Sequence, residues 1–511
     1  MPRATWIQQN FNAGEWSPTV YGRVGLDKYK NALATCLNYV PTVQGMLTRR
    51  PGTRYVANSK GNNAVRFQRF EFSTTQAYVL EFGNNYIRFY TNDGQLLSGG
   101  VPYEVATTYT TGELFGLNFT QSADVLYITH PSHAPAKLQR LGATSWTLTS
   151  ISFVDGPYLN TNSTATTLTP SGTTGAVTVT ASAVTGINNG SGFRASDVGR
   201  MLRIKCGGVW LWGTITAYTD TTHVTRTIAD PTGTLVPRTA TAHGNASGGS
   251  IFTASVDDGG SGYGNSPPSV TIGGAGSGAV AYATLYNGTV VSVTMSVTGT
   301  GYGTGSVAMT LSAPSAIVAS STTFWRLGVW NSTDGYPSVT TFYQDRLCFA
   351  GSTNYPQRVD CSATGDYENF APSNVDGTVV DSNGLSFTLS AAEVNAVRWI
   401  ISDEKGMLVG TTGGEWVVRP SSVNDALTPT NISAKQATQY GSANVQAFKI
   451  GKATLFISRD AKRMREMAYV FQTDGFQSPD ISLVSNHLLL DGIKQIRSEE
   501  HTSELQSRLH L

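Results

Sequence analysis

The sequence predicts a mainly β protein with a β-propeller-like core, an inserted small β-barrel or β-sandwich region and a short N-terminal helix. Most apolar stretches are short, alternate with polar residues and end at Gly, Asn or Asp, which is typical of antiparallel strands. Charged residues make up only 14% of the 511 residues, and the net charge is +1. A dedicated nucleic-acid binder would carry a basic excess to neutralise phosphates, so this composition favours a self-assembling β protein.

The clearest helical pattern lies in residues 26–40, within an N-terminal segment of residues 1–60. Its apolar residues repeat at the spacing of one helix face: Leu26, Tyr29, Leu33, Leu37 and Val40. Asp27 lies near the start, where a carboxylate favours the helix dipole, and Pro41 follows the end. We therefore expect a short helix that packs through its leucines.

A basic turn follows the predicted helix. Arg49, Arg50 and Arg54 flank a Pro-Gly dipeptide, so the three side chains are expected to project together. One interpretation is an interface with carboxylates of a neighbouring subunit or adaptor protein, or with a passing phosphate backbone. The alternative is a solvated turn whose arginines pair with local acids. We interpret residues 1–60 as an assembly segment.

Composition and strand pattern divide the rest of the chain. Residues 61–160 are predicted to form the first part of the propeller-like core, with a hairpin at Gly83, Asn84 and Asn85. Residues 161–245 read as an inserted β-barrel-like domain, and residues 246–320 as a Gly-, Thr- and Ser-rich β decoration. Residues 321–496 complete the core, because strands such as LFISRD followed by REMAYV are what a propeller blade supplies.

A glycine–tyrosine motif occurs twice in the decoration, around Tyr263 and Tyr302. Exposed tyrosines could stack on sugars, so both are candidate glycan contacts. The alternative is that they anchor turns. Strand-forming residues rather than a helix follow each motif, so the glycines do not predict a phosphate site.

No catalytic residue, cofactor site or metal site is predicted. His130 and His133 lie on a loop beside prolines, and no third ligand is near them in the sequence, which argues against zinc. Asp376, Asp381 and Asn383 fit ordinary turns better than a calcium loop. The protein is therefore not expected to be an enzyme.

The cysteines and the apolar runs bear on the cellular compartment. Cys36, Cys206, Cys348 and Cys361 lack metal-ligand spacing, and we expect free thiols in a chain made in a reducing cytoplasm. Pairing of Cys348 with Cys361 across neighbouring strands is the alternative. No secretory signal is visible, and no apolar run approaches the ~20 residues that span a bilayer, so no membrane segment is predicted.

Residues 497–511 are predicted to be artefactual. They read RSEEHTSELQSRLHL, and residues 497–507 resemble a short-read sequencing adapter translated in frame. We exclude them from the fold prediction. We also expect the natural chain to continue past Ile496.

Several motifs resemble one protein family. FNAGEWSP, YGRVGLDKY and YVPTVQGMLTRRPGTRYV are similar to the N-terminal signature of podovirus-type bacteriophage tail nozzle proteins (tail tubular protein B-like) and tail hub stabilisation proteins. TFYQDRLCFAG, GDYENFAPS, GTTGGEWVV and AYVFQTDGF follow in the order of the same family.

The resemblance implies a structural, non-enzymatic protein of the virion tail, made in the bacterial host cytoplasm. It implies a ring homo-oligomer, expected to be a hexamer, below the portal and a tail tubular protein A-like adaptor ring. Such a ring would form the channel through which genomic DNA leaves, touching the DNA transiently, with tail fibres or spikes as further partners. The alternative is a tail-associated carbohydrate-binding or depolymerising receptor protein, with the insertion as its active part.

Overall fold

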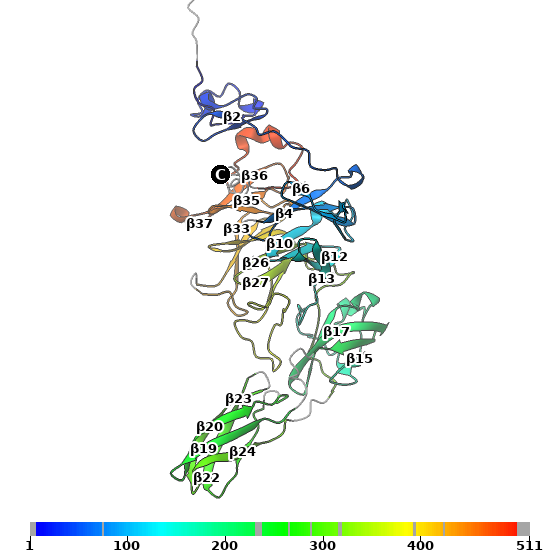
Figure 1. Ribbon diagram of the computed structural model, residues 1–511, viewed down its shortest axis with the longest axis vertical. Helices are drawn as coiled ribbons and strands as arrows, with labels where there is room; N and C mark the ends of the chain where they lie inside the picture. Colours follow the sequence, from blue (N-terminus) through cyan, green and yellow to red (C-terminus); the bar gives the residue numbers. More distant parts are fainter. Residues whose placement is uncertain are drawn as a thin grey trace, which may run out of the picture.

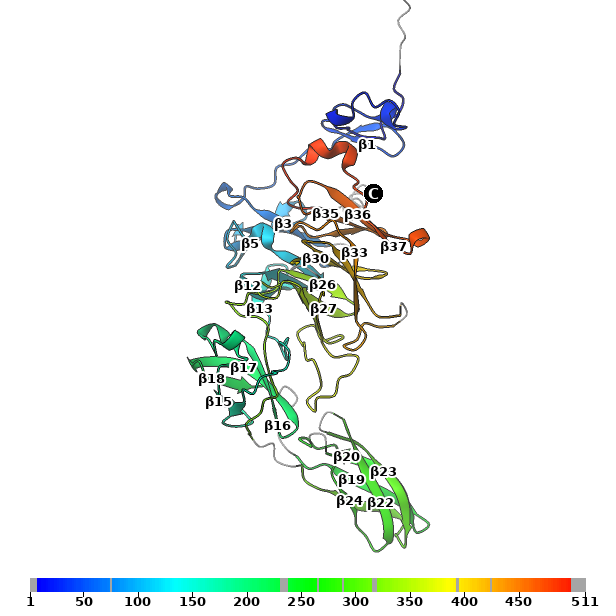
Figure 2. The same ribbon diagram turned by 180° about the vertical axis from the view of Figure 1, so that it is seen from behind.

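The computed structural model describes residues 7–497, apart from residues 74–75, 230–237, 264–265, 287–288, 315–318, 392–394 and 423–424. Within these residues the fold is mainly β, as predicted, and the helices are short 3-10 segments. The molecule is elongated. An N-terminal lobe lies at one end, the core sheets follow, and the inserted regions lie toward the other end (Figure 1 and, from behind, Figure 2).

The core consists of five antiparallel sheets, each made mainly of strands that are consecutive in the chain. The first contains β3 (Arg66–Glu71), β4 (Ala77–Gly83), β5 (Tyr86–Thr91), β6 (Gly94–Gln95) and β9 (Glu104–Ala106). The second contains β10 (Asn118–Ser122), β11 (Val125–His130), β12 (His133–Gly142) and β13 (Ser145–Ser150). The third contains β26 (Val339–Tyr343), β27 (Arg346–Ala350), β28 (Arg358–Cys361) and β29 (Leu385–Thr388). The fourth contains β30 (Val397–Asp403), β31 (Gly406–Thr411), β32 (Glu415–Arg419) and β33 (Ser433–Thr438). The fifth contains β34 (Phe448–Ile450), β35 (Ala453–Ile457), β36 (Met464–Val470) and β37 (Gly475–Gln477).

Tight turns with residues in the left-handed region produce these hairpins. The predicted hairpin is confirmed: Gly83 pairs with Tyr86, and Asn85 between them has a φ of 63°. Gln344 and Asp345, at φ 45° and 55°, make the corresponding turn between β26 and β27. Two successive positive φ values match the twist that a two-residue hairpin requires.

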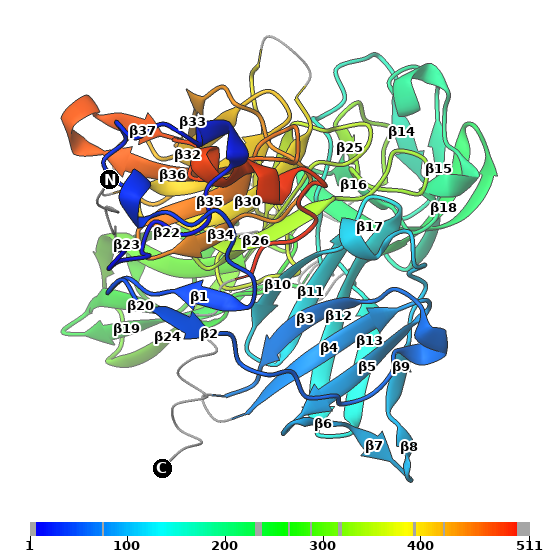
Figure 3. The same ribbon diagram turned by 90° about the horizontal axis from the view of Figure 1, so that it is seen from above.

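Apolar clusters join the sheets in chain order, and Figure 3 shows the first two sheets (blue and cyan) to one side of the last two (yellow to orange). Phe82 and Leu126 share a buried cluster that joins the first and second sheets. Tyr127 and Phe349 share one that joins the second and third. The third and fourth sheets, and then the fourth and fifth, share two further clusters, with Trp399 buried in the second of these. Each sheet therefore has an apolar face that its neighbour covers.

The inserted regions form separate sheets. The first is six-stranded, with β14 (Leu168–Pro170), β15 (Ala176–Ala181), β18 (His223–Ile228), β17 (Val209–Asp220), β16 (Met201–Cys206) and β25 (Trp325–Leu327) in that order. The second combines β20 (Ser250–Asp258), β19 (Thr241–Ser247), β24 (Gly305–Leu311) and β21 (Val270–Ile272) with a hairpin of β22 (Ser277–Tyr286) and β23 (Thr289–Thr300). The predicted boundary at residue 245 therefore falls inside β19, and β25 returns from beyond the second insertion to complete the first sheet.

Short elements fill the connections. The N-terminal lobe contains η1 (Pro18–Val20), η2 (Tyr29–Asn31), β1 (Tyr39–Pro41) and β2 (Leu47–Arg49). The others are η3 (Lys60–Asn62), β7 (Leu97–Ser98), β8 (Val101–Pro102), η4 (Leu114–Gly116), η5 (Asn188–Gly190), η6 (Ala195–Asp197), η7 (Phe471–Thr473) and η8 (Leu483–Leu489). No helix in this described part of the chain has both the length and the apolar character needed to cross a bilayer.

The predicted N-terminal helix is wrong. Residues 26–40 contain only the single turn η2 and the strand β1. Leu33 makes its backbone bonds with another segment instead of within a helix: its N–H donates to Gly14, and its carbonyl accepts from Trp16. Leu37, assigned to the buried face, is 72% exposed. A short helix needs an apolar face that is packed along its length to offset its costly nucleation, and among the described residues Leu26, Leu37 and Val40 of this segment remain exposed.

The expectation of free thiols is wrong for two of the four cysteines. Cys348 and Cys361 form a disulfide. They are directly opposite each other in β27 and β28, and both are fully buried. Cys36 and Cys206 are free.

Candidate functional site

The N-terminal lobe, residues 7–56, is attached to the C-terminal segment by polar contacts. Ser17 N–H donates to the Val484 carbonyl at 2.7 Å, and the Ser485 hydroxyl donates to the Glu15 carbonyl at 2.6 Å. Glu15 Oε1 lies 3.0 Å from His487 Nε2, and this hydrogen bond lowers the pKa of Glu15. The two ends of the described chain are thus held together at one end of the molecule.

The lobe buries very little of its own apolar surface. Among its described residues, Trp16 is the one large apolar side chain that is buried. The exposed large apolar side chains are Ile7, Tyr21, Val24, Leu26, Leu37, Tyr39, Val40, Val43, Met46, Tyr55 and Val56. Leu483, Leu488 and Leu490 add to them from the adjoining C-terminal segment. Large exposed apolar patches often mark interaction sites, so this lobe is the candidate contact surface of the described chain.

The three arginines lie on this lobe and are exposed. Arg49 and Arg50 line one shallow hollow together with Asn38, and Arg50 Nε donates to Asn38 Oδ1 at 3.3 Å. Arg54 lies 3.7 Å from Asp93, and both side chains are mostly solvated. An exposed pair of this kind contributes little to stability. Arg49 and Arg50 therefore come together as the sequence suggested, whereas Arg54 faces an acid of the core.

The two tyrosines proposed as glycan contacts lie inside the second insertion. Tyr263 and Tyr302 are each 6% exposed and share one apolar cluster. The Tyr263 hydroxyl accepts from Ala240 N–H at 2.7 Å and donates to the Ser312 carbonyl at 3.1 Å. This position fits the alternative interpretation, in which the tyrosines anchor turns. The exposed aromatic residues of this region are Phe252, Tyr282 and Tyr286. Within β22, Tyr282 and Tyr286 alternate with Ala and Leu residues that are buried or half-buried. This alternation is the sequence pattern that could have predicted their exposure.

The acidic turns behave as turns. Asp376 Oδ1 accepts from the backbone N–H and the hydroxyl of Thr378, at 2.8 and 2.7 Å. Asn383 Oδ1 accepts from Val380 N–H at 2.8 Å. These oxygens therefore accept hydrogen bonds from neighbouring residues of the same turns. Among the described residues, the side chains that come together as possible metal ligands are instead Glu113, His130 and His133.

The family comparison concerns the second half of the core. Residues 338–505 match the family described as bacteriophage nozzle protein. The predicted family resemblance is confirmed. The matched region contains the third, fourth and fifth core sheets and most of the motifs that suggested the family. It indicates a structural component of a phage tail in the virion.

The match ends at residue 505 and so overlaps the segment interpreted as adapter sequence. Of that segment, residues 498–511 lie outside the described residues. No curated protein matches the chain in sequence.

Two of the solved structures that match the chain overlap it only poorly. Apo AztD from Citrobacter koseri is 8% identical and aligns over 81% of this chain and 85% of its own, with a TM-score of 0.25. PorZ, a bacterial surface component of the type-IX secretion system of Porphyromonas gingivalis, is 10% identical. It aligns over 83% of this chain and 58% of its own, with a TM-score of 0.21. Overlaps at these scores support no assignment of fold or function.

Proposed function

We propose that the protein is a nozzle or hub subunit that assembles into a ring below the portal and adaptor and lines the channel through which DNA leaves. In this proposal the five core sheets act as blades of a propeller-like body, and the N-terminal lobe makes the contact between subunits. The nozzle family match supports the place in the tail. The observation that carries the assembly role is the exposed apolar surface of the lobe.

The lobe is too small and too poorly packed to be stable by itself. A segment of about 50 residues without a core normally needs a partner, a metal or disulfides. Its apolar side chains would be covered if a second copy of the chain packed on it. Repeating one such contact around an axis closes a ring. Arg49 and Arg50 would then lie at the rim, where charge sets orientation more than affinity.

The charge balance fits a channel through which DNA passes. A net charge of +1 provides no strong attraction for phosphates. Contact with the genome would therefore be transient. The adaptor ring and the tail fibres or spikes remain proposed partners on the strength of the family alone.

A paired-variant experiment tests the assembly surface. Leu37→Asp with Val43→Asp places charges on side chains that are 72% and 89% exposed, so the monomer fold is expected to survive. We expect association, measured by light scattering and analytical ultracentrifugation, to weaken at least tenfold. Val291→Asp with Val297→Asp, at exposed positions of β23, is the matched control. A wild-type chain that stays monomeric even with the adaptor ring would sink the proposal, and so would equal weakening by both pairs.

Substitution of Arg49 and Arg50 distinguishes a contact with protein from a contact with DNA. Arg49→Ala with Arg50→Ala should weaken association with a neighbouring subunit or the adaptor and leave DNA affinity nearly unchanged. A clear fall in DNA affinity, with a reduced salt dependence, would assign the basic turn to the nucleic acid instead.

A further inference from the structure

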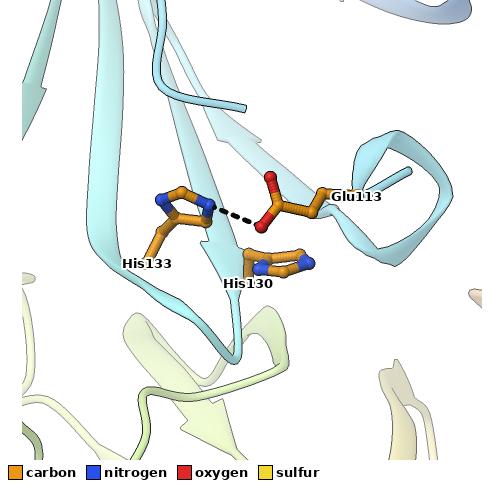
Figure 4. Close-up of side chains that lie close together, drawn as sticks. All are labelled: Glu113, His130 and His133. Carbon is orange, nitrogen blue, oxygen red and sulfur yellow. Dashed lines mark hydrogen bonds and ion pairs between the residues drawn. The ribbon is translucent and has the colours of Figure 1, made fainter. Parts of the chain in front are cut away.

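Three metal-binding side chains meet where the first and second core sheets are connected (Figure 4). Glu113 directly precedes η4, His130 ends β11, and His133 begins β12. The two histidines are paired across the β11–β12 hairpin. One ligand atom from each of the three residues lies within 4.8 Å of the others. The sequence argument against zinc did not consider Glu113, because this residue comes from an earlier loop and not from the hairpin itself.

Contacts behind the cluster hold Glu113 and His133 in position. Glu113 Oε2 accepts from the backbone N–H and the hydroxyl of Thr110, both at 2.8 Å. Its other oxygen, Oε1, is directed at His133 Nε2, 3.0 Å away. His133 Nδ1 lies 3.2 Å from the Thr108 hydroxyl, and its ring meets Tyr109 edge-on. Outer contacts of this kind are what orient metal ligands in known sites.

His130 completes the group from a buried position. It is 7% exposed, and its Nδ1 accepts the Ser132 N–H at 3.2 Å. The ring lies against Gly116, where a side chain would come 3.0 Å from Nε2, so the glycine makes room for it. Because Nδ1 accepts the hydrogen bond from Ser132, it carries a lone pair, and the bond is long enough to be weak.

We propose that Glu113, His130 and His133 bind one divalent transition-metal ion, Zn²⁺ by preference, with water as a fourth ligand. Two imidazoles and one carboxylate are a ligand set that suits zinc. Ligand atoms around tetrahedral zinc lie roughly 3.3 Å apart, given bonds of about 2.0–2.1 Å. The contact between Glu113 and His133 already meets this spacing, and a small rotation of His130 supplies the third ligand. The ion would fasten the loop before η4 to the β11–β12 hairpin, and this role does not depend on ring assembly.

Zinc titration of the untagged full chain, after dialysis against a chelator, tests the site. We expect one Zn²⁺ per chain by calorimetry and a rise in Tm on zinc addition, because the ion binds only the folded state. Glu113→Gln and His130→Gln should each lower the affinity at least tenfold. His243→Gln is the matched control, since His243 is a partly exposed histidine 2.7 Å from Asp257 in the second insertion. Co²⁺ substitution gives a second readout that needs no variant, because four-coordinate Co²⁺ absorbs strongly in the visible range.

The zinc titration has outcomes that support the proposed site and outcomes that contradict it. Tight binding that is lost in both cluster variants and kept in the control supports the proposal. Binding that His243→Gln weakens as much as the cluster variants do, or no binding at micromolar zinc, overturns it. In that case the cluster is a hydrogen-bonded Glu–His pair that ties two loops together without an ion.

Discussion

The carboxyl group of Glu415 lies inside the core on β32, with a side chain that is 0% exposed. Burial raises its pKa, although the hydroxyls of Thr438 and Ser442 donate to it at 2.6 and 2.9 Å. A raised folded pKa means that the folded state binds the proton more tightly than the unfolded chain does. The contribution of Glu415 to stability is therefore largest below its unfolded pKa, about 4.3, and is lost as the pH rises through the folded value.

Glu415→Gln should remove this pH dependence. We expect the variant to be at least as stable as the wild type at neutral pH and to lose less stability between pH 4.5 and 7.5. Thermal unfolding across this range is the measurement, and Glu404→Gln, at an exposed position, is the control. If the Tm of Glu415→Gln depends on pH as steeply as that of the wild type, the buried carboxyl is not the source of the pH dependence.

Arg346 shows what a sequence can and cannot reveal about one residue. Its place in a strand was predictable, because Leu347, Cys348 and Phe349 follow it. Its role was not, because Nη1 donates to the carbonyls of Ser362 and Asn383 and Nη2 donates to that of Asp381. These acceptors lie far along the chain, and only the folded core brings them to one buried guanidinium.

Arg346→Met should destabilise the core by roughly 2–4 kcal/mol, since it leaves three carbonyls without this donor. Urea unfolding followed by intrinsic tryptophan fluorescence measures the loss. Arg459→Met, at an exposed position, should change stability by less than about 0.5 kcal/mol. Equal effects of the two substitutions would contradict the structural role of Arg346.

At the scale of elements, hairpins were predictable and the helix was not. Asn84 and Asn85 carry their turn conformation in their own chemistry, so a local signal was sufficient. The apolar spacing of residues 26–40 was also local, but a helix depends on what covers it. In the described part of the chain, Leu37 and Val43 are left mostly uncovered. Leu26, Leu37 and Val40, whose spacing suggested a buried helix face, belong instead to the exposed apolar surface of the lobe.

The β27–β28 pair should depend on its disulfide. Cys348 and Cys361 are 13 residues apart, so the cross-link is expected to stabilise the core by about 3 kcal/mol through loop closure. Alkylation of the unfolded chain without reductant should label only Cys36 and Cys206, as read by intact mass. Labelling of all four cysteines would show that the pair is reduced in the purified protein.

At the scale of the whole molecule, the order of motifs was enough to predict the phage nozzle resemblance, and strand punctuation was enough to predict a mainly β fold. The Glu113–His130–His133 cluster could not be predicted, because its members are brought together by the packing of a loop on a hairpin. For Tyr263 and Tyr302 the sequence left two interpretations open, and their burial fits the one in which they anchor turns. Glycine-rich turns look exposed in a sequence, yet here Gly276 and Gly299 lie against the ring of Tyr302.

The second insertion should be removable without loss of the rest. It has its own apolar cluster, and its chain leaves the first inserted sheet after β18 and returns to it at β25. A flexible linker of about twenty Gly and Ser residues reaches roughly 25 Å on average and can extend further, so it can replace residues 230–319. We expect this shortened chain to keep the Tm of the core transition and the subunit number of the full chain, measured by calorimetry and native mass spectrometry. Loss of the core transition would mean that the insertion supports the fold, and a changed subunit number would place part of the assembly surface on the insertion instead of the N-terminal lobe.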